Sequence, residues 1–322
     1  MGLVRAVRGT FGALCAADPR GFEWVPLAPE PGSGSRAWRH LELPRLVRRH
    51  GLVGLHAFTS GFCVRGPGWR TATVHELPWR HDERENAGFA HRLWARHGWR
   101  RAARLVTASR RTAADLAREA PRAASRIRFV PFGVEPAFFA EPLDAVVLKE
   151  LQLEPGFVLI PGGARAKKRL GDALLAAAHL GQTVVVATGA RTPEFVAMEA
   201  LAHRLGVRLV APGMVREDRW PGLVAAAGVV LCIARSEGFA LPVVEALAVC
   251  VRPVVPPDSQ GADLANGHAE IADPTDSGAL AAAIERARGV DDAARAAGRA
   301  HAAGFTFERT AQGLMDVWEE LI

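Results

Sequence analysis

Short apolar runs alternate along the chain with longer segments in which apolar residues recur every three or four positions. In the second half, largely apolar runs bounded by glycine or proline predict β-strands at 157–160, 183–187, 207–210, 229–233 and 253–255. Helical spacing predicts helices between them at 171–180, 194–205, 217–227 and 242–250. Strands that are apolar on both faces are typical of a parallel sheet covered by helices on both sides. The alternation therefore predicts an α/β architecture with doubly wound parallel sheets.

The first half repeats this alternation less regularly. Strands are predicted at 23–27, 54–57, 72–75, 104–107 and 128–130. Helices are predicted at 3–16, 36–50, 84–101 and 109–119, the last with Ser109 as its N-cap. A doubly wound domain normally starts with a strand that lies inside the sheet. Because this chain starts with a helical pattern, we expect the first strand of the N-terminal domain to be missing.

A proline- and glycine-rich segment, 131–156, predicts the connection between two domains. A length of 322 residues suits two domains better than one. We therefore predict an N-terminal domain at 1–140, a second domain at 141–305, and a C-terminal helix within 306–322 that is apolar on one side.

The apolar runs, the N-terminal residues and the cysteines argue against a membrane-spanning, secreted, disulfide-linked or zinc-binding protein. No run reaches the roughly 18 apolar residues of a membrane-spanning helix, and Arg5 and Arg8 interrupt what would be the apolar part of a signal peptide. We therefore expect a cytoplasmic protein. Cys15, Cys63, Cys232 and Cys250 are scattered, with no zinc-ligand spacing, so neither a disulfide framework nor a metal site is expected.

The charge is unevenly distributed between the two halves. Residues 1–140 contain 23 arginines and 11 acidic residues, a balance of +12, whereas residues 141–322 contain 17 basic and 23 acidic residues, a balance of −6. A basic half favours an anionic partner such as a lipid surface or an acidic acceptor, but solvated arginines on helix faces give the same count. No nucleic-acid partner is expected, because no nucleic-acid-binding module and no interleaving of aromatic and basic residues is present.

A glycine-rich turn follows the predicted strand 157–160. Gly162 and Gly163 allow the backbone to approach a phosphate, and the helix that follows directs N–H groups toward it. Arg165, Lys167 and Lys168 add positive charge. The chain has three lysines, and two of them lie here, which favours a phosphate site over an ordinary basic surface.

An acidic motif follows the predicted strand 229–233 in the segment 236–248, S-E-G-F-A-L-P-V-V-E-A-L-A. Glu237 is expected in the loop at the carboxyl end of the strand, where open parallel sheets bind ligands. Glu245 is expected in the helix that opens near Pro242. Carboxylates at these places can accept hydrogen bonds from sugar and ribose hydroxyls, although each alone could simply complement the helix dipole.

The segment 236–248 resembles the E-x7-E motif of the retaining glycosyltransferases of the GT-B fold, the glycosyltransferase 4 (group 1) family. Segment 129–135 resembles the V-I-P-N-G-V-D of that family, and Gly162 to Lys168 resembles its G-S-L-E-P-R-K loop. Segment 305–308 resembles the start of its last helix, which crosses back to the first domain. The resemblance is closest over 129–322, and in the first half His75 lies in a segment similar to the V-x-H-D of the family.

The resemblance implies two Rossmann-like domains facing a cleft, with the acceptor bound by the first and the donor by the second. It implies that Lys168 binds the donor diphosphate with the N–H of Gly163, that Glu237 contacts the transferred sugar, and that Glu245 binds the ribose. The backbone of Phe239, Ala240 and Leu241 would lie along the sugar and phosphates, with Gly162, Arg165 and Lys167 completing the donor-binding set. His75 would reach the reacting sugar, although a histidine at a strand end is often only structural.

The chain departs from the family at two positions. Cys250 stands where the family usually has glycine, and Gly163 stands where arginine is frequent, for which Arg165 or Lys167 could compensate. The charged loop 76–86 is expected either to touch the acceptor or to be solvated.

The resemblance thus implies transfer of a hexose from a UDP- or GDP-sugar to an acceptor, with retention and without metal or other cofactor. The acceptor, lipid-linked or a polysaccharide, is left open, as is contact of the basic domain with the inner face of the membrane. Two alternatives remain: a sugar-nucleotide epimerase of the same architecture, and a degenerate protein that binds nucleotide sugars without turnover.

Overall fold

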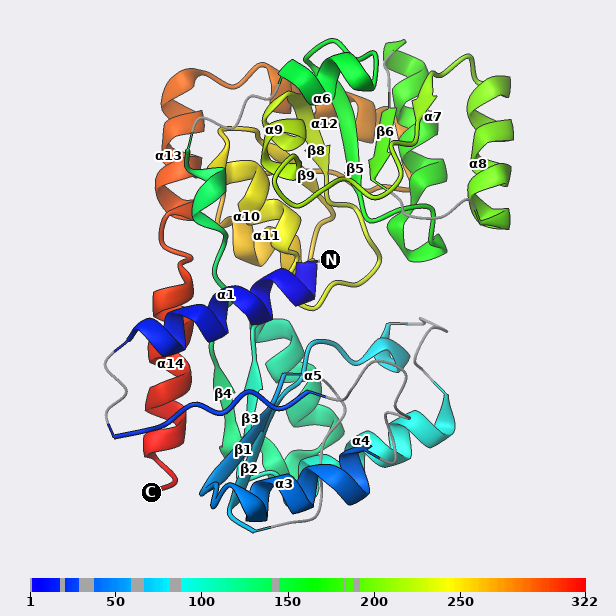
Figure 1. Cartoon of the computed structure of the whole chain (residues 1–322). Helices are drawn as coiled ribbons and strands as arrows, with labels where there is room; N and C mark the ends of the chain where they lie inside the picture. The colour runs from blue at the N-terminus through cyan, green and yellow to red at the C-terminus, as the bar shows by residue number, and fades with distance from the viewer. Residues whose placement is uncertain are drawn as a thin grey trace. The chain divides into compact units, whose positions relative to one another are not determined.

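The computed structural model describes residues 2–17, 21–28, 38–58, 67–81, 88–140, 145–181, 184–187 and 192–322. The chain forms two compact units (Figure 1). Unit 1 comprises residues 1–133 and 307–322, and unit 2 comprises residues 134–306.

Unit 1 contains a parallel sheet with the strand order β1-β2-β3-β4. Its strands are β1 (Gly54–Ala57), β2 (Trp69–Thr73), β3 (Arg104–Thr107) and β4 (Ile127–Phe129). A doubly wound sheet has its first strand inside, whereas β1 lies at an edge of the described sheet.

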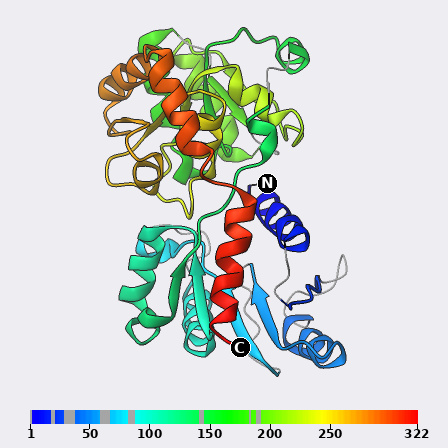
Figure 2. The same ribbon diagram turned by 90° about the vertical axis from the view of Figure 1, so that its left-hand side faces the viewer.

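Helices cover both faces of this sheet. Leu105 of β3 packs in a core with α4 (Phe89–Arg101) and α5 (Arg110–Glu119). The next residue, Val106, packs on the opposite face with α1 (Gly2–Ala16) and α14 (Phe307–Glu319). Figure 2 shows α1 and α14 side by side, the first in blue and the second in red. Alternate residues of one strand thus serve two cores, as the period of two in a strand requires.

Unit 2 contains a six-stranded parallel sheet with the order β10-β9-β8-β5-β6-β7. The strands are β5 (Phe157–Pro161), β6 (Val184–Ala187), β7 (Leu209–Val210), β8 (Ala227–Leu231), β9 (Pro253–Val255) and β10 (Glu270–Ile271). The chain adds β6 and β7 on one side of β5, and then β8, β9 and β10 on the other. The direction of winding therefore reverses between β5 and β8, and such a switch point is where sheets of this kind bind ligands.

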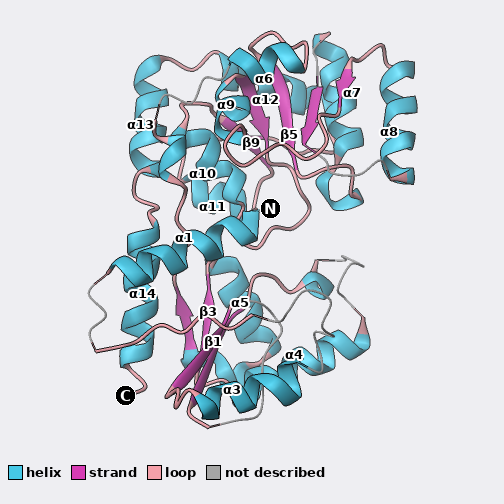
Figure 3. Ribbon diagram, viewed as in Figure 1, coloured by secondary structure: helices cyan, strands magenta, loops and turns pink. Residues whose placement is uncertain are grey.

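The helices of unit 2 form a layer on each face of the sheet (Figure 3). One core contains α7 (Leu170–Leu180), α8 (Pro193–Arg204) and α12 (Ser277–Arg288). The other face contacts α9 (Trp220–Ala225), α10 (Leu241–Ala248) and α11 (Gln260–Ala265), and α13 (Asp292–Ala302) packs on α10.

Most predicted elements are confirmed. Ser109 caps α5, since its Oγ accepts a hydrogen bond from the N–H of Thr112 at 3.1 Å. The predicted strand 23–27 is wrong: this segment is not part of a strand, because no described neighbour pairs with it. The predicted helix 36–50 is described from residue 38 as a π-helical turn η1 (Trp38–Glu42) followed by α3 (Leu43–Arg49). The predicted helix 84–101 is described from Phe89 onward, and residues 84–87 lie outside the described residues.

Several elements were not predicted. The connecting segment contains α6 (Ala145–Glu150), and the elements β10, α11, α12 and α13 were also missed. Short 3₁₀ turns occur at η2 (Pro78–Arg80), η3 (Pro121–Arg126), η4 (Pro136–Phe138) and η5 (Ala166–Lys168).

Candidate functional site

Two loops of unit 2 meet at the switch point of its sheet. Residues 162–169 follow β5, and residues 232–240 follow β8, the strand that pairs with β5 in parallel. Both loops leave the carboxyl ends of their strands, so they lie at the same edge of the sheet. The N–H of Arg235 in the second loop donates to the carbonyl oxygen of Lys167 in the first at 2.9 Å. The glycine-rich turn and the acidic motif are therefore parts of one site.

The glycine-rich turn requires glycine at position 162. Gly162 and Gly163 have φ values of +98° and +83°, which lie in the region that favours glycine. A Cβ atom added at Gly162 would lie 2.7 Å from Cε and 3.1 Å from Nζ of Lys168. The side chain of Lys168 therefore lies directly over the turn.

Lys168 forms an ion pair with Glu237 across the two loops. The side chain of Lys168 is 10% exposed and that of Glu237 is 24% exposed, so the pair is shielded from water without being sealed off. A shielded ammonium beside exposed backbone of a glycine turn is suited to binding a phosphate oxygen.

Glu245 lies on α10, which begins after Ala240, a residue in the left-handed conformation with φ of +58°. Glu245 is only 2% exposed. Its Oε2 accepts a hydrogen bond of 3.0 Å from the indole Nε1 of Trp220, which begins α9. Sequence reasoning missed Trp220, because an isolated tryptophan in a helical segment gives no signal beyond core packing.

The thiol of Cys232 is a common neighbour of the charged groups. Burial raises the pKa of this thiol, Glu237 and Glu245 raise it further, and Lys168 lowers it. All three charged side chains thus act on one sulfur atom at the end of β8. Lys168 and Glu237 therefore meet in an ion pair, and the charge of Glu245 acts on the same thiol.

The remaining residues predicted for donor binding surround this centre. Arg165 is exposed and Lys167 is half-buried in the turn before α7. Phe239 and Ala240 are buried, and Leu241 is half-buried at the start of α10. The ring of Phe239 lies 6.2 Å from that of Phe305.

Ser236, beside Glu237, was not predicted as a site residue. It is 8% exposed, and its Oγ has no hydrogen-bond partner among the described residues.

His75 lies in unit 1, two residues after β2. Its Nε2 donates to the carbonyl oxygen of Phe58 at 2.6 Å, and its ring stacks on Phe132 with centroids 5.7 Å apart. Burial lowers the pKa of His75, while the Phe58 carbonyl and Glu76 act in the opposite direction. One ring nitrogen is therefore used structurally, which leaves Nδ1 for any contact with a substrate.

The charged loop after His75 is described as far as residue 81. Arg80 lies 3.4 Å from a carboxylate oxygen of Asp115, and His81 lies 2.7 Å from the other. Arg80 also pairs with Glu119, which is bound as well by arginines of α4. This part of the loop is thus held on α5 by ion pairs. Residues 82–86 lie outside the described residues.

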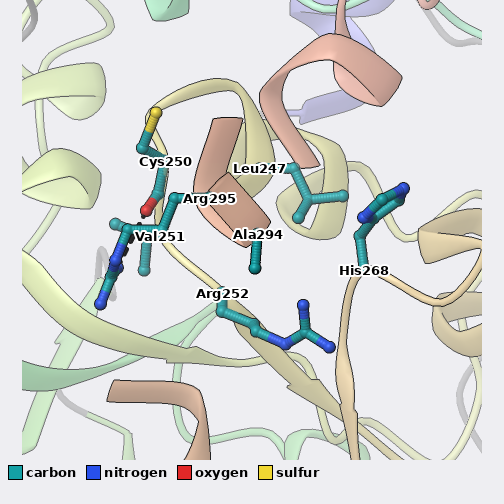
Figure 4. Close-up of a pocket in the computed structure, with 7 residues that line it drawn as sticks. All are labelled: Leu247, Cys250, Val251, Arg252, His268, Ala294 and Arg295. Carbon is teal, nitrogen blue, oxygen red and sulfur yellow. Dashed lines mark hydrogen bonds between the residues drawn. The ribbon is translucent and has the colours of Figure 1, made fainter. Parts of the chain in front are cut away.

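A small hollow elsewhere in unit 2 has a different character. It is lined by Leu247, Cys250, Val251, Arg252, His268, Ala294 and Arg295 (Figure 4). Leu247, Cys250, Val251 and Arg252 come just before β9, and His268 comes just before β10, so the hollow lies at the amino ends of these strands. Ligand sites of open parallel sheets lie at the opposite edge, and the predicted site residues line none of this hollow.

None of the helices in the described ranges combines the length and apolarity needed to cross a membrane. Nor does the described part of the chain contain a group of three or more side chains suited to a metal ion.

Residues 149–299 match the family described as Glycosyl transferases group 1. Among curated proteins no match is found. These residues include both loops of the site.

Solved structures of similar fold extend over nearly the whole chain. Sucrose-phosphate synthase from Thermosynechococcus elongatus has a TM-score of 0.77 at 18% identity, with 98% of this chain and 92% of that chain covered. HepE from Anabaena, in complex with UDP and glucose, has a TM-score of 0.71 at 18% identity, covering 89% and 84%. A glycosyltransferase from Rickettsia africae has a TM-score of 0.68 at 13% identity, covering 92% and 84%.

These likenesses establish the fold, and the family match covers the unit that holds the two joined loops. Residues 149–299 are therefore similar to the group 1 glycosyl transferases, and the chain has the GT-B fold.

Proposed function

We propose that this glycosyltransferase moves a hexose from a nucleotide-diphosphate sugar, UDP- or GDP-linked, to an acceptor with retention of configuration. The observation that carries the proposal is the meeting of Lys168 and Glu237 at the switch point of unit 2, with Glu245 acting on the same thiol. In this arrangement the cation grips the diphosphate and the two acids bind hydroxyl groups.

In such a transfer the nucleoside diphosphate is the leaving group, and the site has to stabilise the negative charge that develops on it. The Lys168 ammonium lies over the glycine turn, where it can neutralise charge that develops on the phosphate oxygens. Arg165 and Lys167 add positive charge at the same turn. The proposal therefore requires neither a metal ion nor another cofactor, and Glu237 is released from its ion pair to bind the transferred sugar.

The proposal assigns acceptor binding to unit 1, with His75 directing Nδ1 toward the reacting sugar. HepE was solved with UDP and glucose, which supports a nucleotide-sugar donor for a chain of the same fold.

We propose that unit 1 binds an anionic membrane surface, which is where a lipid-linked acceptor would lie. Helix α4 contains four arginines and no acid. Arg92 and Arg96 pair with Glu119, whereas Arg100 and Arg101 are exposed. Phe89 and Leu93, four residues apart on one face, are 81% and 58% exposed. Exposed apolar residues beside arginines favour binding at the surface of an anionic membrane. Co-sedimentation with phosphatidylglycerol vesicles is expected to fall in Phe89→Glu, and absence of binding by the wild type at low salt would remove this partner.

The experiment that tests the donor is a thermal-shift panel of UDP-, GDP-, ADP- and TDP-sugars, since a ligand of the folded state raises its melting temperature. The ligand that stabilises is then incubated with and without candidate acceptors, and the products are identified. Transfer only in the presence of an acceptor supports the proposal. A free sugar or an isomer formed without acceptor indicates the epimerase, and binding without any product indicates the degenerate protein.

A further inference from the structure

The hollow at the amino ends of β9 and β10 combines an apolar wall with basic side chains. Leu247 and Val251 line it and are buried. Arg252 and His268 enter it from the segments just before β9 and β10. Figure 4 shows the guanidinium of Arg252 and the ring of His268 on the same side of the hollow. Because the two joined loops lie at the opposite edge of the sheet, a ligand in this hollow is not the sugar donor.

The acid that pairs with Arg252 is shared with a second arginine. Glu270 Oε1 accepts from Nε of Arg252 at 3.0 Å, and its Oε2 accepts from Nε of Arg286 at 3.0 Å. Nη2 of Arg252 donates to the carbonyl oxygens of Gly267 and Ala269. Nη1 of Arg252 makes no hydrogen bond to another residue in the described ranges. One carboxylate thus serves two guanidinium groups, and a positive charge remains.

Arg295 adds a second guanidinium to the wall of the hollow. Its Nη1 and Nη2 donate to the carbonyl oxygens of Cys250 at 3.1 Å and of Arg288 at 2.8 Å. A carbonyl group satisfies a donor without cancelling its charge. Asp291 is an exposed acid close to the hollow, but its Oδ1 caps α13 by accepting from the N–H of Ala294 at 2.7 Å. The hollow therefore carries more positive than negative charge.

His268 is half-buried, and its ring nitrogens make no hydrogen bond within the described part of the chain. Its ring packs against that of His301 on α13, with centroids 5.3 Å apart. Burial lowers the pKa of His268, and both His301 and Arg252 lower it further. The charged and titratable groups that act on this ring thus oppose its protonation, whereas an anion beside it would favour protonation.

We propose that this hollow is a second binding site of unit 2, which binds a phosphate group between the guanidinium of Arg252 and the ring of His268. Nη1 of Arg252 and a ring N–H of His268 donate to its oxygen atoms, as arginine and protonated histidine commonly do with phosphates. A doubly charged anion suits the hollow better than a carboxylate, because Arg252, Arg295 and a protonated His268 then face it. Binding takes up a proton on His268, so the affinity increases as the pH falls.

This site is independent of the proposed function, since none of its residues belongs to the two joined loops. Inorganic phosphate and the phosphate of a small phosphomonoester share the required chemistry. The first probe is sulfate, which keeps its double charge over the whole range in which histidine titrates, so that any dependence on pH arises in the protein.

The test follows the histidine rings by NMR as the pH is varied, with sodium chloride replaced by sodium sulfate at constant ionic strength. The signal that is absent from His268→Gln is assigned to His268. Calorimetry measures the Kd of sulfate at about pH 5 and about pH 8. His203→Gln is the matched control, because His203 is exposed on α8. Lys168→Met identifies any sulfate bound at the proposed donor site.

Sulfate is expected to move the titration of His268 to higher pH. We expect the wild type to bind sulfate about tenfold more tightly at the lower pH, since one more cation then faces the anion. His268→Gln should lose this dependence on pH, and Arg252→Gln should bind at least about tenfold more weakly at both values. His203→Gln and Lys168→Met should behave as the wild type. If Arg252→Gln does not fold without its pair to Glu270, Arg252→Lys and His268→Gln replace it.

Wild-type affinity in both Arg252→Gln and His268→Gln would overturn the inference, as would a His268 titration that sulfate does not move. Loss of all sulfate binding in Lys168→Met would assign the anion to the donor site and would also overturn it. Competition by inorganic phosphate, by glycerol phosphate and by acetate then identifies the ligand. Tighter binding of either phosphate than of acetate supports the proposed class and shows whether the free ion or the ester is preferred, whereas equal binding of acetate would refute it.

Discussion

Replacement of Lys168 by methionine removes one ammonium group and keeps most of the apolar stem. The ammonium pairs with Glu237 and lies over Gly162. Lys168→Met therefore has two separable effects. It leaves Glu237 without its partner in the free protein, and it leaves a bound diphosphate without its cation.

The magnitude of each effect follows from the exposure of the pair. Exposed ion pairs contribute about 0–1 kcal/mol, and breaking a fully buried pair costs about 3–5 kcal/mol. At 10% and 24% side-chain exposure this pair lies between those limits, so we expect a loss of about 1–2 kcal/mol of unfolding free energy. A hydrogen bond to a charged group is worth about 1.5–3 kcal/mol. The affinity for a nucleoside diphosphate should therefore fall by at least about tenfold.

The two effects are separated by the double variant Lys168→Met/Glu237→Gln. Urea unfolding is expected to show that it recovers most of the lost stability, because no unpaired charge remains. Calorimetry with UDP or GDP is expected to show no recovery of affinity, because the cation is still missing. Lys149→Met, at an exposed position of α6, is the control for loss of a lysine. Wild-type diphosphate affinity in Lys168→Met would refute the assignment of Lys168 to the donor site.

Three further predictions concern single residues. Glu245→Ala should weaken nucleotide binding by on the order of 1–3 kcal/mol, because it removes a buried acceptor; unchanged affinity in calorimetry would exclude that role. Cys250 has φ of +63°, and this conformation costs about 1–2 kcal/mol for a residue with a Cβ. Cys250→Gly should therefore raise the unfolding free energy by about 0.5–1 kcal/mol, once the greater chain entropy of unfolded glycine is subtracted. A lower urea midpoint would contradict this. Burial, with the nearby His75 as a smaller cause, lowers the pKa of His56 from 6.5 to about 3. Between these values the unfolded chain binds a proton that the folded chain does not, so stability should fall as the pH drops below 6.5, by at most about 1.4 kcal/mol per pH unit; His56→Gln should show a shallower slope, and equal slopes would count against this cause.

The parts of the site that could be predicted lie next to the ends of strands. Gly162, Lys168 and Glu237 each follow a strongly apolar run, so their place at the carboxyl edge of a sheet followed from local sequence. Lys168 and Glu237 meet because β5 and β8 are neighbours in the sheet. This strand order could not be read from the sequence, so the ion pair could not be predicted. The contact of Trp220 with Glu245 could not be predicted, because it joins two helices whose relative position is set by tertiary packing.

The errors in the fold also have physical causes. Segment 23–27 has the residues of a strand, but a strand exists only where a neighbour pairs with it. Helix α6 was missed because it is short and lies between prolines, which locally indicate a connection. The left-handed conformation of Cys250 accounts for the glycine that the family usually has at this position.

The half-buried thiol of Cys232, at the end of β8, makes the proposed donor site measurable without a label. A protonated thiol reacts slowly with alkylating reagents, because the thiolate is the nucleophile. Burial is the largest cause of the raised pKa of the Cys232 thiol; Glu237 and Glu245 raise this pKa further, and Lys168 lowers it. Neutralising either acid should therefore quicken the alkylation of the thiol to a small extent. A diphosphate bound by Lys168 would add negative charge near the thiol and shield it from the reagent, so it should slow the alkylation of Cys232. The rate of thiol modification, read by mass spectrometry, would then report occupancy of the site even before a sugar or an acceptor is known.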